Sequence, residues 1–234
     1  MKIVLSFLVC WGMRSWLYAQ EGNGLYRVKS GSDVTKTIPV KEQFQYKDFV
    51  DGVAYYRNGR KANAKLNYNL AHGEVMFISP EKDTMLFSEN KFIYKVDVGG
   101  NLYYFNEGLG HVEIIGDYDR AKLGRKQFLV RAGEEKYAAY GQYSSTSATT
   151  GYSSFINANG EFQHLQSGDK IVMKRRVIYY FMDKNLTLYL ANRSNLLKIH
   201  PGNKRALNEY LKDNQISFDN EEDLRNVLEF CMTL

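Results

Sequence analysis

The sequence predicts an α+β fold, mainly β: an antiparallel meander that forms a barrel or a sandwich, with two C-terminal helices packed on it. Three observations predict this class. From about residue 51, short apolar stretches alternate with turn signals at the spacing of consecutive strands. Tyrosine and phenylalanine number 18 and 13 against 3 prolines, which suits pleated sheets. After residue 190 the apolar residues recur at helical spacing, so helices and sheet are segregated along the chain.

Residues 1–19 have the anatomy of a cleaved signal peptide. Lys2 supplies a positive start, residues 3–13 form a short uncharged apolar run, and Leu17-Tyr18-Ala19 offers a cleavage site before Gln20. The run is shorter than the roughly 20 residues that cross a bilayer as a helix. We therefore expect an exported chain, periplasmic or extracellular, with no transmembrane span after cleavage.

The β domain is expected to cover residues 20–190, beginning with a lead-in of one or two short strands up to residue 48. A strand at 52–57 is followed by Asn58-Gly59, the dipeptide that favours a type I′ hairpin turn. In the returning strand, 62–70, apolar residues alternate with asparagine and lysine, which predicts one apolar and one polar face. Further strands are predicted at 74–78, 84–87, 92–98, 102–105, 111–115, 127–131, 170–182 and 186–190.

Residues 137–155 interrupt this pattern, because small hydroxyl residues and tyrosines replace the apolar periodicity. We expect a long loop there. Tyrosine gives rigid, amphipathic contact area. The loop tyrosines Tyr140, Tyr143 and Tyr152 are therefore the candidate ligand-binding residues, set against a bare surface loop that binds nothing.

The C-terminal segment, residues 191–234, is predicted to be helical. Ser194 is the expected cap of a short turn at 195–199, and a helix follows around Leu207 to Leu211. Acidic residues at 219–222 predict the start of a final helix. Its apolar stripe consists of Leu224, Val227, Leu228 and Cys231. Cleavage of the signal removes Cys10, so we expect Cys231 to be a buried thiol with no intramolecular disulfide partner.

The charge balance disfavours nucleic acid as a partner. The formal net charge of +5 falls to +3 when Lys2 and Arg14 leave with the signal. The one basic run, Lys174-Arg175-Arg176, lies inside an apolar strand pattern. A nucleic-acid footprint needs a wider basic face.

No motif in the sequence indicates catalytic residues, a metal site or a cofactor. The four histidines, at 72, 111, 164 and 200, lack the helical spacing of a zinc pair and are expected at the surface or at caps. Ser153 lacks the second glycine of a hydrolase elbow, and the two Ser-x-x-Lys matches lack their companion motifs. Asp117 and Asp119 have no surrounding calcium loop, so a solvated loop is expected there.

Several stretches resemble a group of uncharacterised exported proteins of Bacteroidota. They are the run from Asp51 to Gly59, residues 64–70, 73–74, 77–78, 140–141, 145–147, 194–197 and 219–230. The resemblance covers most of the chain and implies export, with no known catalytic residue. Asp83-Thr84-Met85 also resembles the O-glycosylation tripeptide of that phylum, which makes Thr84 a candidate modification site.

The sequence thus favours an exported, non-enzymatic protein of the bacterial cell envelope or periplasm that binds a glycan, a peptide or an envelope partner. The alternative is an envelope-directed hydrolase whose carboxylates or histidines are dispersed in sequence. A small outer-membrane barrel is disfavoured by the helical C-terminal segment.

Overall fold

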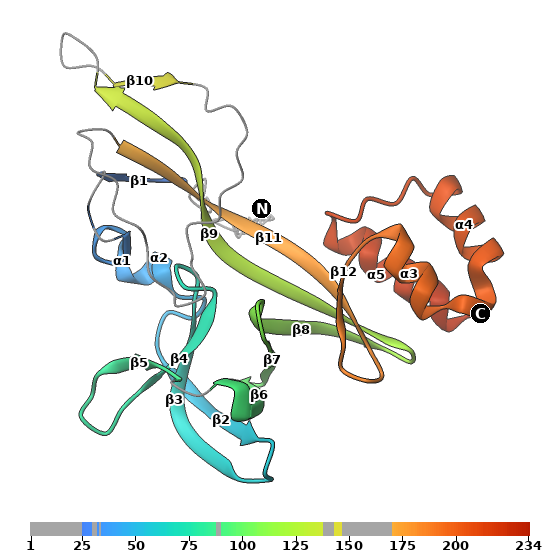
Figure 1. The fold of residues 1–234 in the computed structure, drawn as a ribbon, viewed down its shortest axis with the longest axis horizontal. Helices are drawn as coiled ribbons and strands as arrows, with labels where there is room; N and C mark the ends of the chain where they lie inside the picture. The colour runs from blue at the N-terminus through green and yellow to red at the C-terminus, as the bar shows by residue number, and fades with distance from the viewer. Residues whose placement is uncertain (1–24, 30–31, 33, 88–89, 138–142, 147–169) are drawn as a thin grey trace, which may run out of the picture.

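A single antiparallel sheet organises the chain (Figure 1). The computed structural model describes residues 25–29, 32, 34–87, 90–137, 143–146 and 170–234. In chain order its strands are β1 (Leu25–Lys29), β2 (Val50–Tyr56), β3 (Lys61–Asn69), β4 (Glu74–Ile78), β5 (Thr84–Leu86), β6 (Ile93–Val98), β7 (Asn101–Asn106), β8 (Gly110–Tyr118), β9 (Ala121–Tyr137), β10 (Tyr143–Thr146), β11 (Lys170–Asp183) and β12 (Leu188–Leu190).

The strand order is β1-β11-β9-β8-β7-β6-β2-β3-β4-β5, with β10 added to β9 and β12 to β11. The predicted fold class, mainly antiparallel β with a helical C-terminal region, is confirmed. The barrel form of that prediction is wrong, because within the described residues the end strands β1 and β5 do not pair with each other and the sheet stays open.

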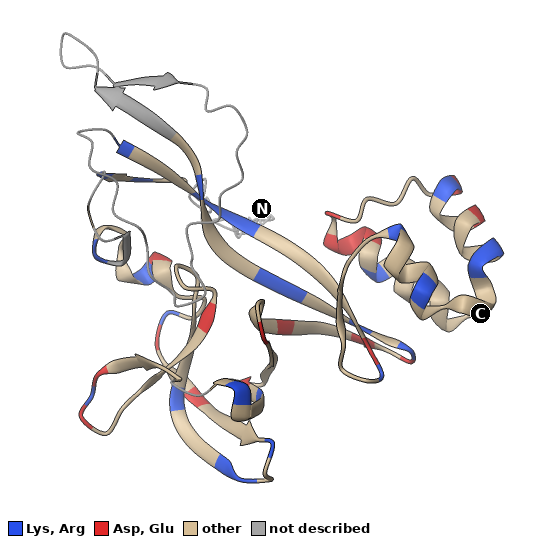
Figure 2. Cartoon of the chain, viewed as in Figure 1, with Lys and Arg blue, Asp and Glu red and all other residues tan. Residues whose placement is uncertain are grey.

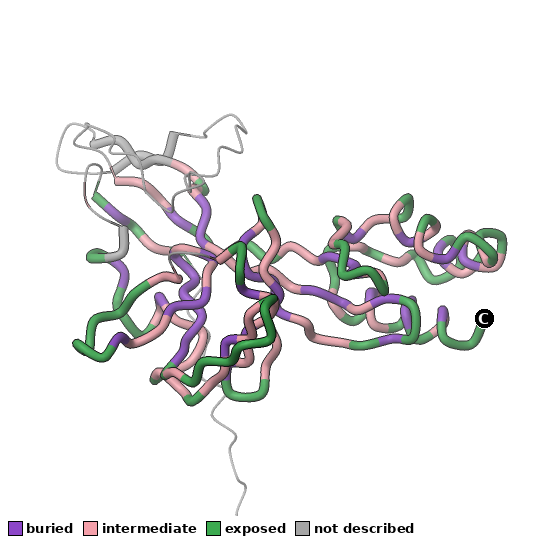
Figure 3. Tube along the Cα trace, turned by 60° about the horizontal axis from the view of Figure 1, so that its bottom comes forward, coloured by how far each residue is buried: buried purple, intermediate pink, exposed green. Residues whose placement is uncertain are grey.

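The open sheet nevertheless curls, so that the β3–β4 hairpin meets β9. Leu129 donates its backbone N–H to the carbonyl of Leu70 at 2.9 Å, and the Tyr68 hydroxyl donates to the carbonyl of Gln127 at 2.8 Å. The space between is filled by a sheet core, a cluster of buried apolar side chains in which the Tyr68 and Tyr103 rings stack at 5.2 Å. In Figure 3, the buried residues, drawn in purple, recur along the strands.

The hairpin between β2 and β3 differs from the predicted type I′ turn. Of Asn58 and Gly59, only Gly59 has a positive φ, at 84°, whereas a type I′ turn requires it at both positions. The side chain of Asn58 instead accepts the backbone N–H of Arg60 at 3.0 Å. A local side-chain hydrogen bond therefore fixes the turn.

The returning strand β3 buries both of its faces near its end, which the alternation did not predict. Leu66, Tyr68 and Leu70 enter the sheet core, but Asn67 and Asn69 are also buried, at 1% and 2% exposure. The segment after helix α2 (Val40–Gln43) pairs with the end of β3, and the Asn69 side chain accepts the backbone N–H groups of Ala71 and His72 in the turn that follows. Asn67 accepts from the N–H of Tyr46 and donates to its carbonyl. Asparagine is needed there because its amide satisfies the backbone beside it.

Strands β9 and β11 form a long ribbon that joins the curled body of the sheet to the helices (Figure 1). The helical region consists of α3 (Arg193–Ile199), the short η3 (Pro201–Asn203), α4 (Lys204–Asp213) and α5 (Glu221–Met232). Smaller helices, α1 (Val34–Thr37) and η1 (Asn90–Phe92), lie elsewhere in the chain. No helix in the described ranges has both the length and the apolar character needed to cross a bilayer.

The helices bury the stripe that the sequence predicted. Leu224, Val227 and Leu228 are fully buried in a helical core against β8, β9 and β11, and Cys231 is buried beside them. Burial raises the pKa of the Cys231 thiol to about 11. The expected cap Ser194 is wrong, since Asn192 caps α3 by accepting the N–H of Asn195. Asparagine ranks with serine as an N-cap, and the sequence offers both.

An arginine on β9 ties α5 to the sheet. The Arg125 guanidinium donates to the Glu113 carboxylate on β8 at 2.9 and 3.1 Å, and to the Glu221 carboxylate of α5 at 3.1 Å. The Glu113 side chain is only 5% exposed. Because a buried carboxylate is costly without a cation, this arginine links the first turn of α5 to β8 and β9.

Candidate functional site

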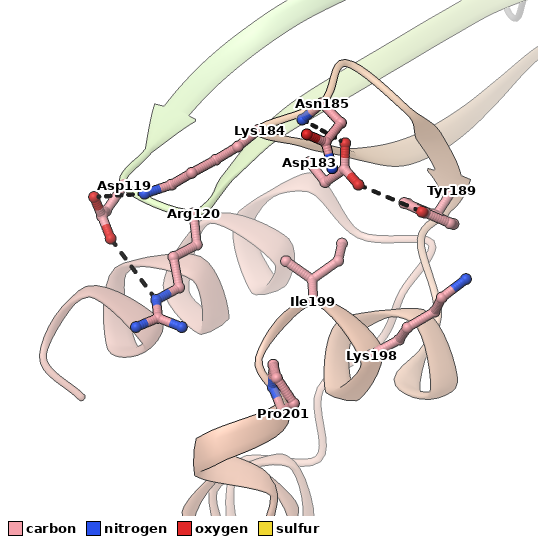
Figure 4. Close-up of a pocket in the computed structure, with 9 residues that line it drawn as sticks. All are labelled: Asp119, Arg120, Asp183, Lys184, Asn185, Tyr189, Lys198, Ile199 and Pro201. Atoms are coloured by element: carbon pink, nitrogen blue, oxygen red, sulfur yellow. Dashed lines mark hydrogen bonds and ion pairs between the residues drawn. The ribbon is translucent and has the colours of Figure 1, made fainter.

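A pocket of about 450 Å³ lies where two hairpin turns meet the end of α3 (Figure 4). Asp119 and Arg120 form the two-residue turn between β8 and β9. Asp183 to Asn185 start the turn between β11 and β12. The two turns lie at the same end of the sheet because Asp183 pairs with Ala121, so that the β8–β9 and β11–β12 hairpins end side by side. Tyr189 of β12, Lys198 and Ile199 at the end of α3, and Pro201 of η3 complete the lining.

The carboxylate of Asp183 shapes the second turn. It accepts the backbone N–H groups of Asn185 and Thr187, each at 2.9 Å. Leu186, between them, has a φ of 63°, a conformation that costs free energy in a branched residue. The Asp183 hydrogen bonds hold this strained turn, and they fix the direction in which Lys184 leaves it.

Charges of both signs surround the pocket. Lys184 Nζ lies 3.5 Å and Arg120 Nε 3.9 Å from the Asp119 carboxylate. On the other side, Lys198 Nζ lies 4.5 Å from the centroid of the Tyr189 ring. These side chains are partly solvated, so each pair contributes only about 0–1 kcal/mol. Breaking these pairs to bind a charged ligand therefore costs little free energy.

His200 lies beside this pocket, between the lining residues Ile199 and Pro201. It is 3% exposed, and neither ring nitrogen has a hydrogen-bond partner among the described residues. Burial lowers the pKa of the imidazole, the positive charge of Arg120 lowers it further, and Asp119 opposes both effects. His200 is therefore neutral at pH 7. It occupies the C-cap position of α3, as the capping prediction allowed, but the prediction of a surface side chain is wrong for it.

A second ionisable cluster, Glu74, His111 and Lys126, lies between the β3–β4 hairpin, β8 and β9. The Glu74 carboxylate contacts His111 Nδ1 and also accepts the His111 backbone N–H. The imidazole is fully buried, with the Phe105 ring centroid 5.4 Å away and the Phe87 ring 6.3 Å away. A carboxylate–imidazole pair is a hydrolase arrangement, but here the imidazole is fully buried and the rings of Phe87 and Phe105 pack beside it. Its burial also makes the surface expectation for His111 wrong.

Lys126 gives this cluster a measurable pH dependence. Its ammonium donates to the carbonyl of Gly73 at 2.7 Å, and burial lowers its pKa to about 8, an effect that Glu74 opposes. An unfolded lysine titrates near 10.5. Between these values the unfolded chain holds more protons, so the free energy of unfolding rises with pH.

We expect the native chain to gain about 1 kcal/mol more stability between pH 7 and 9 than Lys126→Met, measured by urea unfolding. Lys212→Met, a change at an exposed lysine of α4, should keep the native slope. Cys231 and the buried tyrosines act in the opposite direction above pH 9, so the comparison stops there. Equal slopes for native chain and Lys126→Met would show that Lys126 is not buried as described.

The predicted tyrosine site lies largely outside the described residues and stays a prediction. Tyr140 and Tyr152 lie outside the described residues, as does His164. Tyr143 begins β10 and pairs with Tyr137 of β9, so the expectation of an unbroken loop at 137–155 is wrong at 143–146. An edge strand forms there because β9 runs on to Tyr137 and offers free backbone groups to hydroxyl and aromatic residues of high β propensity. Thr84, the candidate O-glycosylation site, is exposed at the start of β5.

Comparison with protein families, curated proteins and solved structures gives no match. The site must therefore be judged on its own geometry. Within the described residues, no three His, Cys, Asp or Glu side chains gather as a metal site would require. The pocket residues carried a turn signal in the sequence at Asp183-Lys184-Asn185 and a loop signal at Asp119. Nothing in the sequence placed the two turns together.

Proposed function

We propose that the chain is an exported, non-enzymatic protein of the bacterial cell envelope or periplasm, and that its pocket binds a short charged peptide of an envelope partner. The observation that carries this proposal is the pocket rim. It presents the cations of Arg120, Lys184 and Lys198 together with the carboxylates of Asp119 and Asp183. The signal-like residues 1–19 and the resemblance to exported proteins support the location.

The ligand chemistry follows from the rim and the base of the pocket. A peptide with free termini carries both an ammonium and a carboxylate, so it can satisfy cations and carboxylates at once. The apolar atoms of Ile199 and Pro201 supply the non-polar contact that such pockets use. A neutral sugar fits less well, because Lys198 already lies over the Tyr189 ring on which a sugar would stack.

Export and binding are tested on the same preparation. The full chain is expressed in a Gram-negative host, and the N-terminal sequence of the recovered protein is read first. A start at Gln20 in the periplasmic or medium fraction supports export, and a retained Met1 in the cytoplasm contradicts it.

The pocket is then titrated with a tetrapeptide that has free termini and one acidic and one basic side chain. We expect amide chemical shifts to move at residues 119–120 and 183–189, and Lys184→Gln with Lys198→Gln to weaken binding about tenfold. The control Lys204→Gln with Lys212→Gln removes the same charge from exposed positions on α4. The acetylated, amidated peptide should bind weakly. Shifts spread evenly over the chain, or equal losses in both double variants, would reject the pocket as the site.

A further inference from the structure

Lysines and tyrosines alternate across neighbouring strands on one face of the sheet. Lys61 of β3 is paired with Tyr55 of β2, Tyr55 with Lys95 of β6, and Lys95 with Tyr104 of β7. Paired residues in adjacent strands project from the same face. We call Lys61, Tyr55, Lys95 and Tyr104, with Tyr94 beside them, the lysine–tyrosine row.

The aromatic rings hold the ammonium groups of the row in place. Lys61 Nζ and Lys95 Nζ lie 5.2 and 5.1 Å from the centroid of the same Tyr55 ring. Lys95 Nζ also lies 5.8 Å from the Tyr94 ring, which packs edge-on against Tyr104 at 5.6 Å. Cation–π attraction thus restricts the positions of these ammonium groups, which would otherwise be mobile at the ends of flexible side chains.

More cations border this row at the β2–β3 turn and at η1. Arg57, Arg60 and Lys91 are exposed there, and Arg57 Nε donates to the carbonyl of Lys91 at 2.9 Å. Figure 2 shows basic residues along the β2–β3 hairpin and on the neighbouring short helix. Within the described part of the chain, none of these three cations, nor Lys61 or Lys95, forms an ion pair with a carboxylate.

The acidic groups on the same face of β2 and β6 do not form ion pairs with the row, since Asp51 pairs with Lys65 of β3 at 2.9 Å. Asp97 follows Lys95 by two residues on β6, but its Oδ1 accepts the backbone N–H of Gly100 at 2.7 Å and so stabilises the turn between β6 and β7. Behind the sheet, Ala54 and Val96 are buried in the interior. On the face of the row, Lys61 is exposed and Tyr55, Tyr94 and Lys95 are partly exposed, whereas Tyr104 is 9% exposed and supports Tyr94 from below. Five cations with no counter-charge on one surface attract anions.

We propose that this surface, the lysine–tyrosine row with Arg57, Arg60 and Lys91, binds an acidic polysaccharide. Lys61 and Lys95 are two strands apart, roughly 10 Å along a straight line, which suits a polymer with anionic groups at regular intervals. The hydroxyl of the partly exposed Tyr55 adds hydrogen bonds to sugar oxygens. This binding is separate from the peptide pocket, which lies at the β8–β9 turn beside α3, whereas the row lies on β3, β2, β6 and β7.

Two other polyanions fit the geometry less well. Single-stranded nucleic acid binds by stacking bases on free ring faces, but the ammonium of Lys95 covers the faces of Tyr55 and Tyr94. An anionic membrane surface favours basic residues beside several exposed apolar side chains, whereas Phe92 is the one large apolar side chain with more than a third of its surface exposed among the described residues bordering the row.

The test measures binding of polygalacturonate to the full chain by isothermal titration calorimetry at 20 and 200 mM NaCl. We expect binding that weakens with salt, and Lys61→Gln with Lys95→Gln to lose about tenfold or more in affinity. Lys204→Gln with Lys212→Gln, which removes the same charge from α4, should bind like the native chain. Tyr55→Leu, which keeps both lysines but removes the ring that holds them, should give an intermediate loss.

Thermal unfolding of each variant separates loss of binding from loss of folding, since all four lysines are at least partly exposed. Equal affinity for neutral dextran, equal losses in the two double variants, or tighter binding of single-stranded DNA or of anionic lipid vesicles at the same salt would each overturn the proposal. The peptide titration is independent of these results, so the pocket and this surface can fail separately.

Discussion

Arg125→Gln is expected to lower the free energy of unfolding by about 3 kcal/mol, the lower part of the range for breaking a buried ion pair. The loss arises because the Glu113 carboxylate, 5% exposed, keeps Gln45 as a hydrogen-bond donor but loses its cation. Glu221 also loses its link to β9, although Arg225 still holds it within α5 at 2.8 Å. Urea unfolding followed by far-ultraviolet circular dichroism measures the change.

A double-mutant cycle isolates the pair. In the double variant Glu113→Gln with Arg125→Gln, no buried carboxylate is left without its cation. The double variant should therefore be more stable, by about 1 kcal/mol or more, than the sum of the two single changes predicts. Arg205→Gln is the matched control, because Arg205 pairs with Glu209 on the surface of α4 at 93% exposure and should change stability by less than about 0.5 kcal/mol. Additive single changes would mean that Arg125 acts through packing alone.

Gly52→Ala is expected to cost about 2–3 kcal/mol, because a methyl group at this position overpacks the sheet. Gly52 pairs with Ala64 on β3 and with Val98 on β6. A Cβ there would lie 2.6 Å from Leu66 Cδ1 and closer still to the backbone carbonyl oxygen of Asp97. The side chain of Leu66 can move, but the carbonyl belongs to the adjacent strand, so the β2–β6 pairing must open. The midpoint of urea unfolding reports the loss.

Gly133→Ala is the control for the same chemical change. Gly133 lies in β9, and a Cβ built on it meets no atom within 4 Å. Reduced freedom of the unfolded chain should leave this variant unchanged or stabilised by up to about 1 kcal/mol. If both variants behaved alike, the close approach of β2 and β6 at Gly52 would be wrong.

Local patterns in the sequence predicted the elements but not all of their surroundings. The stripe of Leu224, Val227, Leu228 and Cys231 was visible because helical spacing reports burial directly. The burial of Asn67 and Asn69 was not, because alternation assigns polar residues to water. Here the Asn67 amide bonds the backbone of Tyr46 and the Asn69 amide bonds the turn at Ala71. The prediction of a type I′ turn was wrong for a related reason. A dipeptide preference is only a tendency, and here the Asn58 side chain stabilised a different turn.

The candidate site depended on long-range register and was beyond sequence reasoning. Asp119 and Asp183 were seen as separate turn residues 64 positions apart, and only the pairing of Asp183 with Ala121 brings the turns together. The lysine–tyrosine row likewise requires the registers of three strand pairs at once. A shift of one residue in any of them would move a lysine to the opposite face.

The pairing of β2 with β6 has a consequence for how the chain folds. Most neighbouring strands from β2 to β9 are also consecutive in sequence, so their hairpins form from contacts that are close along the chain. β2 and β6 are separated by the whole β3–β5 excursion, and the chain must close that loop before their backbones can bond. Among the pairings from β2 to β9, this one closes the longest loop, so we expect it to form after the local hairpins, and the glycine at position 52 lies directly on it.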